Sequence, residues 1–144
     1  MRNKRSQRMS IVVQLAQRKK DDAARMLKEC QATLFCEKDK AADLHRYYHT
    51  YEQRFSSKSH AIRASDLSHS RLFLQQLSQA IDGQRLTIEE AERQVLQAQF
   101  FWQQCHLKTK SLLELQQRYA KEENDEEDRR EQRSMDEWVT LRRQ

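Results

Sequence analysis

Apolar residues recur at alternating steps of three and four along the first half of the chain, which predicts a long helix with one buried stripe. One heptad series (position a) starts at Val13, and a second (position d) starts three residues later. The series read Val13, Lys20, Leu27, Leu34, Ala41, Tyr48 and Phe55, and Ala16, Ala23, Cys30, Glu37, Leu44 and Tyr51. Only Lys20 and Glu37 interrupt the stripe. A repeat of 3.5 residues held this long is typical of a helix that supercoils around another.

The same pattern resumes after a polar, serine-rich segment at residues 56–60 and predicts a second helix. Its series read Leu67, Leu74, Ile81, Ile88, Val95 and Trp102, and Ser70, Leu77, Gln84, Ala91, Ala98 and Cys105. Beyond Cys105 we expect the phase to slip, because Leu112, Leu115 and Tyr119 fit the stripe only with a small stutter.

One glycine leaves two interpretations of this second helix open. Gly83 is followed by Thr87 and Glu90, the ends of a capping-box pattern that can start a new helix. The heptad phase nevertheless runs through Gly83 without a shift, and one glycine in a helix costs only about 1 kcal/mol. We therefore favour a single continuous helix.

These patterns predict an all-α fold, a long antiparallel two-helix coiled-coil hairpin that forms a single domain over residues 1–144. We expect helix one at about residues 8–56, a turn at about 57–65 and helix two at about 66–134, with Ser65 or Asp66 as its N-cap. Residues 121–134 carry no apolar side chain, whereas a short tail at 135–144 does: Met135, Trp138, Val139 and Leu141. A single apolar turn cannot fold alone, so we expect the tail to dock on helix one or on a partner.

The composition agrees with exposed helices rather than a compact globule. Only 37% of the residues are hydrophobic and 34% are charged, while the absence of proline and the single glycine argue against disorder. No apolar run approaches the roughly 20 residues that span a bilayer, and the basic N-terminus lacks the apolar core of a secretory signal. Three cysteines without a framework spacing, Cys30, Cys36 and Cys105, indicate reduced thiols in a cytoplasmic protein.

Candidate chemistry in the chain is sparse. His45 and His49 stand one helical turn apart, a spacing that can hold a metal, but no further ligand is placed by the sequence. With one glycine, phosphate-binding loops and nucleophile elbows cannot form. We therefore expect no catalysis, metal, cofactor or small-molecule substrate.

The N-terminal arm is basic and suggests an alternative function. Arg2, Lys4, Arg5 and Arg8 could bind the phosphates of a nucleic acid. However, no recognisable DNA-binding module follows, and the acidic stretch at residues 122–128 disperses the net charge of +5. We expect no nucleic acid partner, and a coiled coil that binds nucleic acid through this arm remains the alternative.

Aromatic residues gather close to the predicted turn. Tyr48, Tyr51 and Phe55 belong to the heptad stripe, whereas Tyr47 and Phe73 lie beside it. A hairpin core uses some of these rings, and the surplus forms an apolar, tyrosine-bearing surface of the kind that binds proteins. Core packing is the alternative role for Leu44, Tyr51 and Leu77.

Three segments of the chain resemble the FliJ family, small cytoplasmic components of the bacterial flagellar type III export apparatus. The likeness extends over nearly the whole chain. It is carried by residues 22–27 (DAARML), by the stripe of Leu44, Tyr47 and Tyr51, and by residues 135–138 (MDEW).

The resemblance implies a fold, partners and site residues. FliJ proteins are antiparallel coiled-coil hairpins, similar to the coiled coil of the ATP synthase γ subunit. They bind the hexameric export ATPase FliI, the export gate protein FlhA and export chaperones, peripherally at the inner membrane. The implied gate-binding residues are Lys40, Leu44, Tyr47, Tyr51, Phe73, Leu77, Ala80 and Gln84. For contact with the ATPase ring we assign Arg5, Arg8, Met135 and Trp138.

The resemblance and the heptads make different demands on three residues. Leu44, Leu77 and Gln84 belong both to the gate-binding set and to the seam, which predicts a coil that is locally splayed near the turn. The function that follows is a non-enzymatic bridge between the export ATPase ring and the export gate that assists chaperone handling. The equivalent stalk protein of a virulence type III secretion system is the alternative within the same class.

Overall fold

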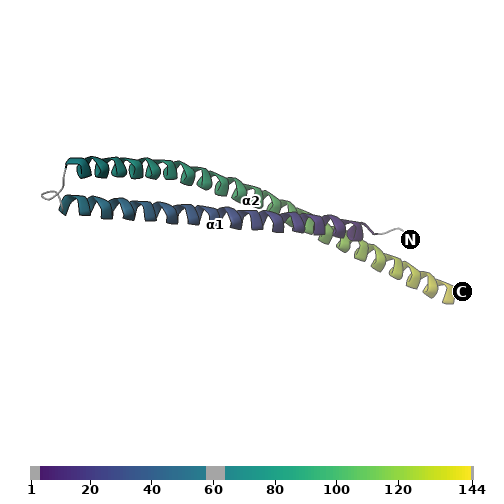
Figure 1. The fold of residues 1–144 in the computed structure, drawn as a ribbon. Helices are drawn as coiled ribbons and strands as arrows, with labels where there is room; N and C mark the ends of the chain where they lie inside the picture. Colours follow the sequence, from purple (N-terminus) through teal and green to yellow (C-terminus); the bar gives the residue numbers. More distant parts are fainter. Residues whose placement is uncertain (1–3, 58–63, 144) are drawn as a thin grey trace. The chain divides into compact units, whose positions relative to one another are not determined.

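The computed structural model describes residues 4–57 and 64–143, and they form two helices, α1 (Arg5–Ser57) and α2 (Ala64–Arg142) (Figure 1). The all-α helical hairpin expected from the heptads is confirmed. Most of the expected turn, residues 58–63, lies outside the described residues. Because α2 begins at Ala64, Ser65 and Asp66 lie inside its first turn, where the carboxylate of Asp66 complements the helix dipole.

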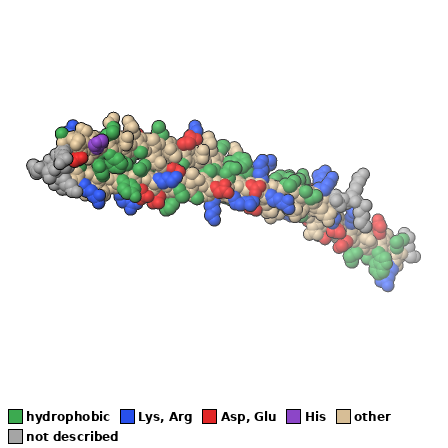
Figure 2. Space-filling model, in the orientation of Figure 1, with side chains coloured by type: hydrophobic (Ala, Val, Ile, Leu, Met, Phe, Trp, Pro, Cys, Tyr) green, Lys and Arg blue, Asp and Glu red, His purple; other side chains and the backbone are tan. Residues whose placement is uncertain are grey.

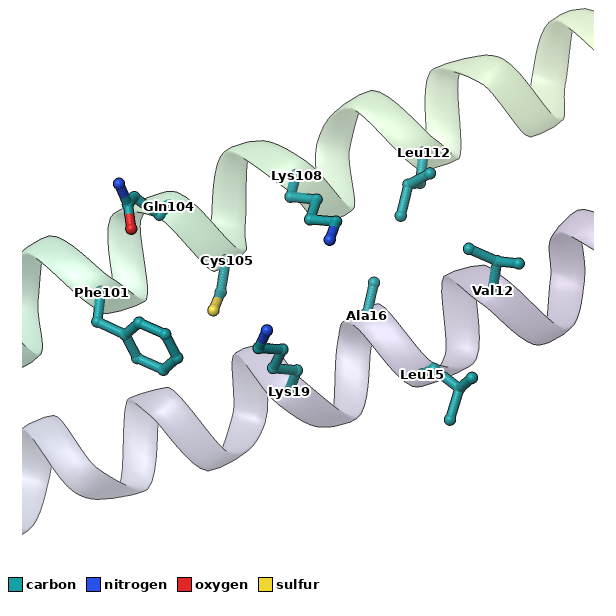
Figure 3. Close-up of a pocket in the computed structure, with 9 residues that line it drawn as sticks. All are labelled: Val12, Leu15, Ala16, Lys19, Phe101, Gln104, Cys105, Lys108 and Leu112. Carbon is teal, nitrogen blue, oxygen red and sulfur yellow. The ribbon is translucent and has the colours of Figure 1, made fainter.

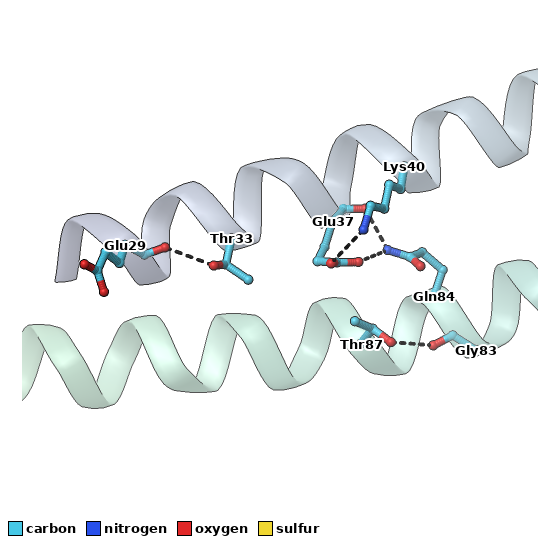
Figure 4. Close-up of polar contacts among 7 residues, drawn as sticks. All are labelled: Glu29, Thr33, Glu37, Lys40, Gly83, Gln84 and Thr87. Atoms are coloured by element: carbon cyan, nitrogen blue, oxygen red, sulfur yellow. Dashed lines mark hydrogen bonds and ion pairs between the residues drawn. The ribbon is translucent and has the colours of Figure 1, made fainter. Parts of the chain in front are cut away.

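The second helix is continuous over 79 residues. It passes through Gly83 without a break, and Thr87 Oγ1 donates a hydrogen bond of 3.2 Å to the Gly83 carbonyl, one turn back in the same helix (Figure 4). Thr87 is therefore a helix-interior residue and not the cap of a new helix. Residues 135–142, expected as a separate tail, continue α2.

The chain divides into two compact units, each of which pairs a segment of α1 with a segment of α2. Unit 1 contains the described residues up to Ala24 and from Phe101 onward, and unit 2 contains Arg25–Phe100. In unit 1, hydrogen bonds join Ser6 to Glu123 and Thr109 to Ala16.

In unit 2, Gln84 bonds to Glu37, and the ring of Tyr51 lies against that of Phe73. Within each unit, partners advance along α1 as they retreat along α2. The two segments of each unit are therefore antiparallel.

The predicted heptads match the burial pattern residue by residue. Between Ile11 and Ser56, every residue of the two series is buried or half-buried, and every other residue is exposed. The same holds in α2 from Ala64 to Cys105. Even the two polar interruptions, Lys20 and Glu37, lie half-buried on the seam.

The expected phase slip after Cys105 is wrong. Half-buried or buried positions continue at intervals of seven, at Thr109, Gln116 and Glu123 in one series and at Leu112 and Tyr119 in the other. The apolar pattern loses its phase because the first series becomes polar, not because the helix changes its winding. Leu115 is also half-buried, so the stripe widens here.

Each polar seam residue of this segment bonds across to α1. The single proton of the Thr109 hydroxyl is shared between the Cys105 carbonyl of α2, at 2.7 Å, and the Ala16 carbonyl of α1, at 3.3 Å. Gln116 Nε2 donates to the Ser6 carbonyl at 3.4 Å. Glu123 accepts from the Ser6 backbone N–H at 3.1 Å and from its hydroxyl at 2.6 Å. The Glu123 carboxylate thus caps the first turn of α1, whose backbone N–H groups lack partners within the helix.

The buried side chains are all small or medium in size. Among the described residues they are Val13, Ala23, Ala91, Ala98, Cys105 and Thr109. Two helices bury only a narrow stripe, so the large seam residues stay half-exposed. In the part of the chain that the structure describes, neither helix contains a stretch apolar enough to cross a membrane.

Candidate partner-binding surfaces

Unit 2 carries an exposed aromatic cluster, here called the tyrosine surface, formed by Tyr47, Tyr51, Phe73 and Leu77. These residues line one pocket together with Thr50 and Arg54. The Tyr51 and Phe73 rings, one from each helix, have centroids 4.6 Å apart at an interplanar angle of 53°. Tyr47 is 68% exposed and Phe73 43% exposed, so large parts of both rings remain available to a partner. Figure 2 shows hydrophobic side chains on the visible face of the molecule among charges of both signs.

All eight residues of the predicted gate-binding set occupy two heptad positions. Position d holds Leu44, Tyr51, Leu77 and Gln84, and position g, the residue before a, holds Lys40, Tyr47, Phe73 and Ala80. The d residues are half-buried and the g residues are exposed. A half-buried seam residue can pack against the other helix on one side and present its edge on the other. The double assignment of Leu44, Leu77 and Gln84 is therefore consistent without further splaying.

Lys40 and Gln84 meet at Glu37 and not at the aromatic rings. Gln84 Nε2 donates to the Glu37 carbonyl at 2.9 Å and to its Oε2 at 2.5 Å, while Lys40 Nζ lies 3.3 Å from Oε1 (Figure 4). The hydrogen bond from Gln84 holds the pKa of the Glu37 carboxyl below its ordinary value. Burial opposes this with a smaller effect than that bond, and Lys40 also lowers the pKa. Lys40 and Gln84 therefore belong to a polar group around Glu37 and not to the tyrosine surface.

The four residues assigned to the ATPase ring lie in unit 1. Arg5 and Arg8 are exposed in the first turns of α1, and the Arg5 guanidinium lies 5.6 Å from the centroid of the Tyr119 ring. Met135 and Trp138 are exposed in the last turns of α2, where Arg142 lies 4.6 Å over the Trp138 ring. The tail does not dock on helix one in this structure, because every described residue from Asn124 onward is exposed.

A second apolar depression, in unit 1, was not predicted from the sequence. Its walls are Val12 and Leu15 of α1 and Phe101 and Leu112 of α2, and it is here called the lysine-flanked groove (Figure 3). Ala16 and Cys105 lie between these walls, and the side chains of Lys19 and Lys108, one from each helix, extend toward the space between the helices. The signal was present in the sequence as apolar residues at heptad positions g and c, outside the a and d series.

Two other groups of residues singled out in the sequence, the histidine pair and the three cysteines, have no ligand-binding geometry in the described structure. His45 and His49 are exposed, and His49 lies 3.4 Å from the Gln53 side chain. Within residues 4–57 and 64–143, no three potential metal ligands cluster. Cys30 is half-buried, Cys36 exposed and Cys105 buried, and all three are free thiols.

The comparison with protein families decides which class of protein this is. A family model described as "Flagellar FliJ protein" matches residues 5–144. The chain belongs to the flagellar FliJ family. It is therefore a component of the flagellar type III export apparatus, and its family is a non-catalytic one. No curated protein and no solved structure matches the chain.

Family membership confirms the resemblance drawn from the sequence, but it assigns no role to individual residues. Within the FliJ match, the tyrosine surface and the residues assigned to the ATPase ring both fall inside the matched range.

Proposed function

We propose that this FliJ-family chain bridges the hexameric export ATPase FliI and the export gate protein FlhA and assists the handling of export chaperones. One observation carries the proposal: each of the two units has exposed apolar side chains that lie beyond the needs of helix pairing. The tyrosine surface lies in unit 2, and Met135 and Trp138 lie in unit 1. Two separate anchoring surfaces are what a bridging protein needs.

The tyrosine surface is the proposed gate-binding surface. Tyrosine supplies a large apolar area together with a hydroxyl that can bond to a partner, which makes it a frequent anchor of protein interfaces. The contact between Tyr51 and Phe73 holds two rings in place before a partner arrives, which reduces the side-chain entropy lost on binding. Binding to a membrane-embedded gate would hold the chain at the inner membrane without a membrane-spanning helix of its own.

The first turns of α1 and the last turns of α2 are the proposed contact with the ATPase ring. Arg5 and Arg8 supply positive charge, which favours fast and oriented encounter more than affinity. Met135 and Trp138 supply the apolar area, since neither is covered in its own unit. The γ subunit, to which the family is similar, offers a precedent for a coiled coil inside a hexameric ring.

The gate assignment is tested by replacing Tyr47 and Phe73 with alanine and measuring affinity for purified FlhA. Truncated anchors of this type commonly cost about 1–2 kcal/mol each, so we expect at least a tenfold loss for the pair. Phe35→Ala is the matched control, because Phe35 is an exposed ring of unit 2 outside the tyrosine surface. Unchanged affinity with unchanged helicity would exclude this surface as the gate contact.

The ring assignment is tested by adding full-length chain, or chain truncated after Ser134, to FliI. We expect the full-length chain to increase hexamer assembly and ATP turnover without hydrolysing ATP itself. The truncated chain lacks Met135 and Trp138, so it should stimulate less while binding FlhA as before. Equal stimulation by both chains would move the contact away from the end of α2.

A further inference from the structure

The lysine-flanked groove of unit 1 is a hollow between two helices that their own side chains do not fill. Its volume is about 330 Å³. The hollow exists because the seam residues beneath it, Ala16 and Cys105, are small, so that the larger side chains stand on either side (Figure 3). The groove is open to water, so its apolar lining side chains keep exposed area that a partner can cover.

The walls of the groove are apolar where a two-stranded coiled coil is usually charged. Val12 and Phe101 occupy position g, and Leu15 occupies position c. Positions e and g of two-stranded coiled coils usually carry charges that pair across the helices. An apolar stripe that extends from a and d onto g is instead the pattern of helices that pack against more than one neighbour. Leu15 is 60% exposed and Phe101 39% exposed, so unit 1 itself supplies no third helix to cover these side chains.

The charge around the groove indicates the kind of neighbour. Lys19 and Lys108 flank it, and Lys19 Nζ lies 5.9 Å from the centroid of the Phe101 ring. None of the nine residues that line the groove in the described structure is acidic. An approaching helix therefore meets apolar walls with a positive charge on each helix, which complements acidic side chains placed beside an apolar face.

We propose that the lysine-flanked groove binds an amphipathic helix of a partner protein, whose apolar face enters the hollow and whose acidic flanks pair with Lys19 and Lys108. This surface shares no residue with the tyrosine surface and does not include Arg5, Arg8, Met135 or Trp138. It therefore adds a third binding surface and does not depend on either proposed contact with gate or ring.

The proposal is tested with two designed peptides of three heptads that share a leucine face and differ only in its flanks, glutamate in one and lysine in the other. Binding to the full chain is measured by fluorescence anisotropy at physiological salt. We expect the glutamate peptide to bind and the lysine peptide not to bind. Equal binding of the two, or no binding of the glutamate peptide, would overturn the proposal.

Substitutions in the chain locate the site. Leu15→Ala should weaken binding of the glutamate peptide about tenfold, whereas Leu86→Ala, at an equally exposed leucine of unit 2, should not change it. The double variant Lys19→Glu and Lys108→Glu should reverse the preference to the lysine peptide. Lys28→Glu with Lys110→Glu, two exposed lysines outside the groove, is its matched control. Retained preference in the groove variant would overturn the proposal.

Other occupants give different results in the same variants. If a second copy of the chain occupies the groove, sedimentation of the chain alone will show self-association that Leu15→Ala abolishes. If it binds anionic lipid, vesicles of phosphatidylglycerol will compete with the glutamate peptide and bind less to the Leu15→Ala variant. Either outcome would overturn the assignment to a partner helix. Circular dichroism of each variant checks that helicity is unchanged.

Discussion

The tyrosine surface of unit 2 and the lysine-flanked groove of unit 1 use the same heptad positions, yet they differ in what fills them. In unit 2, the rings of Tyr51 and Phe73 meet from the two helices. In unit 1, the seam residues Ala16 and Cys105 are too small to close the space, and Lys19 lies over the Phe101 ring. The heptad register decides where on a helix pair a surface can form, whereas side-chain size and charge decide what it binds.

The two units also differ in how they place polar groups on the seam. Unit 2 has Glu37 with Gln84 in a seam that is otherwise mostly apolar. Unit 1 ends in a polar series, Thr109, Gln116 and Glu123, in which each side chain bonds to α1. Polar seam residues give fewer apolar contacts but fix the register of the helices, because a slipped register leaves them without partners.

The largest effect is expected at the aromatic contact of unit 2. Tyr51→Ala removes a half-buried ring and its contact with Phe73, and should lower the free energy of unfolding by about 2 kcal/mol, roughly half the cost at a fully buried site. Leu15→Ala, in the open groove of unit 1, should cost less than about 0.5 kcal/mol. Urea unfolding followed by circular dichroism measures both, and similar losses would remove the distinction between the surfaces.

A second pair of variants compares how tightly the seams are filled. Ala91 is buried in unit 2, so Ala91→Leu should overpack the seam and destabilise the chain by about 1–2 kcal/mol. Ala16 borders the hollow of unit 1, so Ala16→Leu can place its added carbons there and should leave stability nearly unchanged. Thermal melting of the two variants gives the comparison, and an equal fall in Tm would mean that the hollow is not available to a larger side chain.

A smaller gain is expected at Gly83 in unit 2. A Cβ atom added to Gly83 meets no atom within 4 Å, and its backbone angle φ is not positive. Alanine there should stabilise the helix by about 0.5–1 kcal/mol, because glycine loses more backbone entropy on folding. A destabilised Gly83→Ala chain in urea unfolding would contradict this, because it would mean that the folded chain does not accommodate the added methyl group at Gly83.

The smallest effect concerns pH and compares one carboxyl from each unit. The hydrogen bond from Gln84 lowers the pKa of Glu37, and the hydroxyl of Ser6 lowers that of Glu123, both from an ordinary value of 4.5. The folded chain therefore binds fewer protons at these groups than the unfolded chain does. Their stabilising effect is present above about pH 4.5 and is lost as the pH falls through the lowered pKa values.

Unfolding midpoints measured between pH 7 and pH 3 test this pH dependence. Glu37→Gln and Glu123→Gln should each make stability less dependent on pH in this range. Glu131→Gln, at an exposed residue near the end of α2, serves as the control and should leave the dependence unchanged. An unaltered dependence in the first two variants would mean that the cross-helix bonds do not favour the charged carboxylates.

The seam was almost completely predictable from the sequence, because a strict period of seven can satisfy only one face of a helix. Even Lys20 and Glu37 were placed on it by position alone. The seam beyond Cys105 was not predicted, since hydrophobicity cannot identify positions where Thr109, Gln116 and Glu123 replace apolar residues. Their hydrogen bonds depend on backbone groups of α1 that only the paired structure brings within reach.

The candidate surfaces were predicted in part. Tyr47 and Phe73 stood out because they are large apolar residues beside the seam. The lysine-flanked groove was not predicted, for two reasons. Its depth results from the small side chains of Ala16 and Cys105, and its walls come from segments about 90 residues apart in the chain. A pattern along one helix does not reveal a hollow that requires two.

The exposed last turns of α2 have a consequence for amide hydrogen exchange. Between Asn124 and Arg143 no side chain is buried, so this segment is stabilised mainly by its own backbone hydrogen bonds and by local pairs such as Arg130 with Glu126. An isolated helix of about 20 residues is only marginally stable in water, and its amides exchange through local fraying rather than global unfolding. Amides near Ala91 and Ala98, buried on the seam of unit 2, should exchange far more slowly. A partner that binds Met135 and Trp138 must therefore also suppress this fraying, and protection of the last turns of α2 against exchange becomes a direct measure of its occupancy.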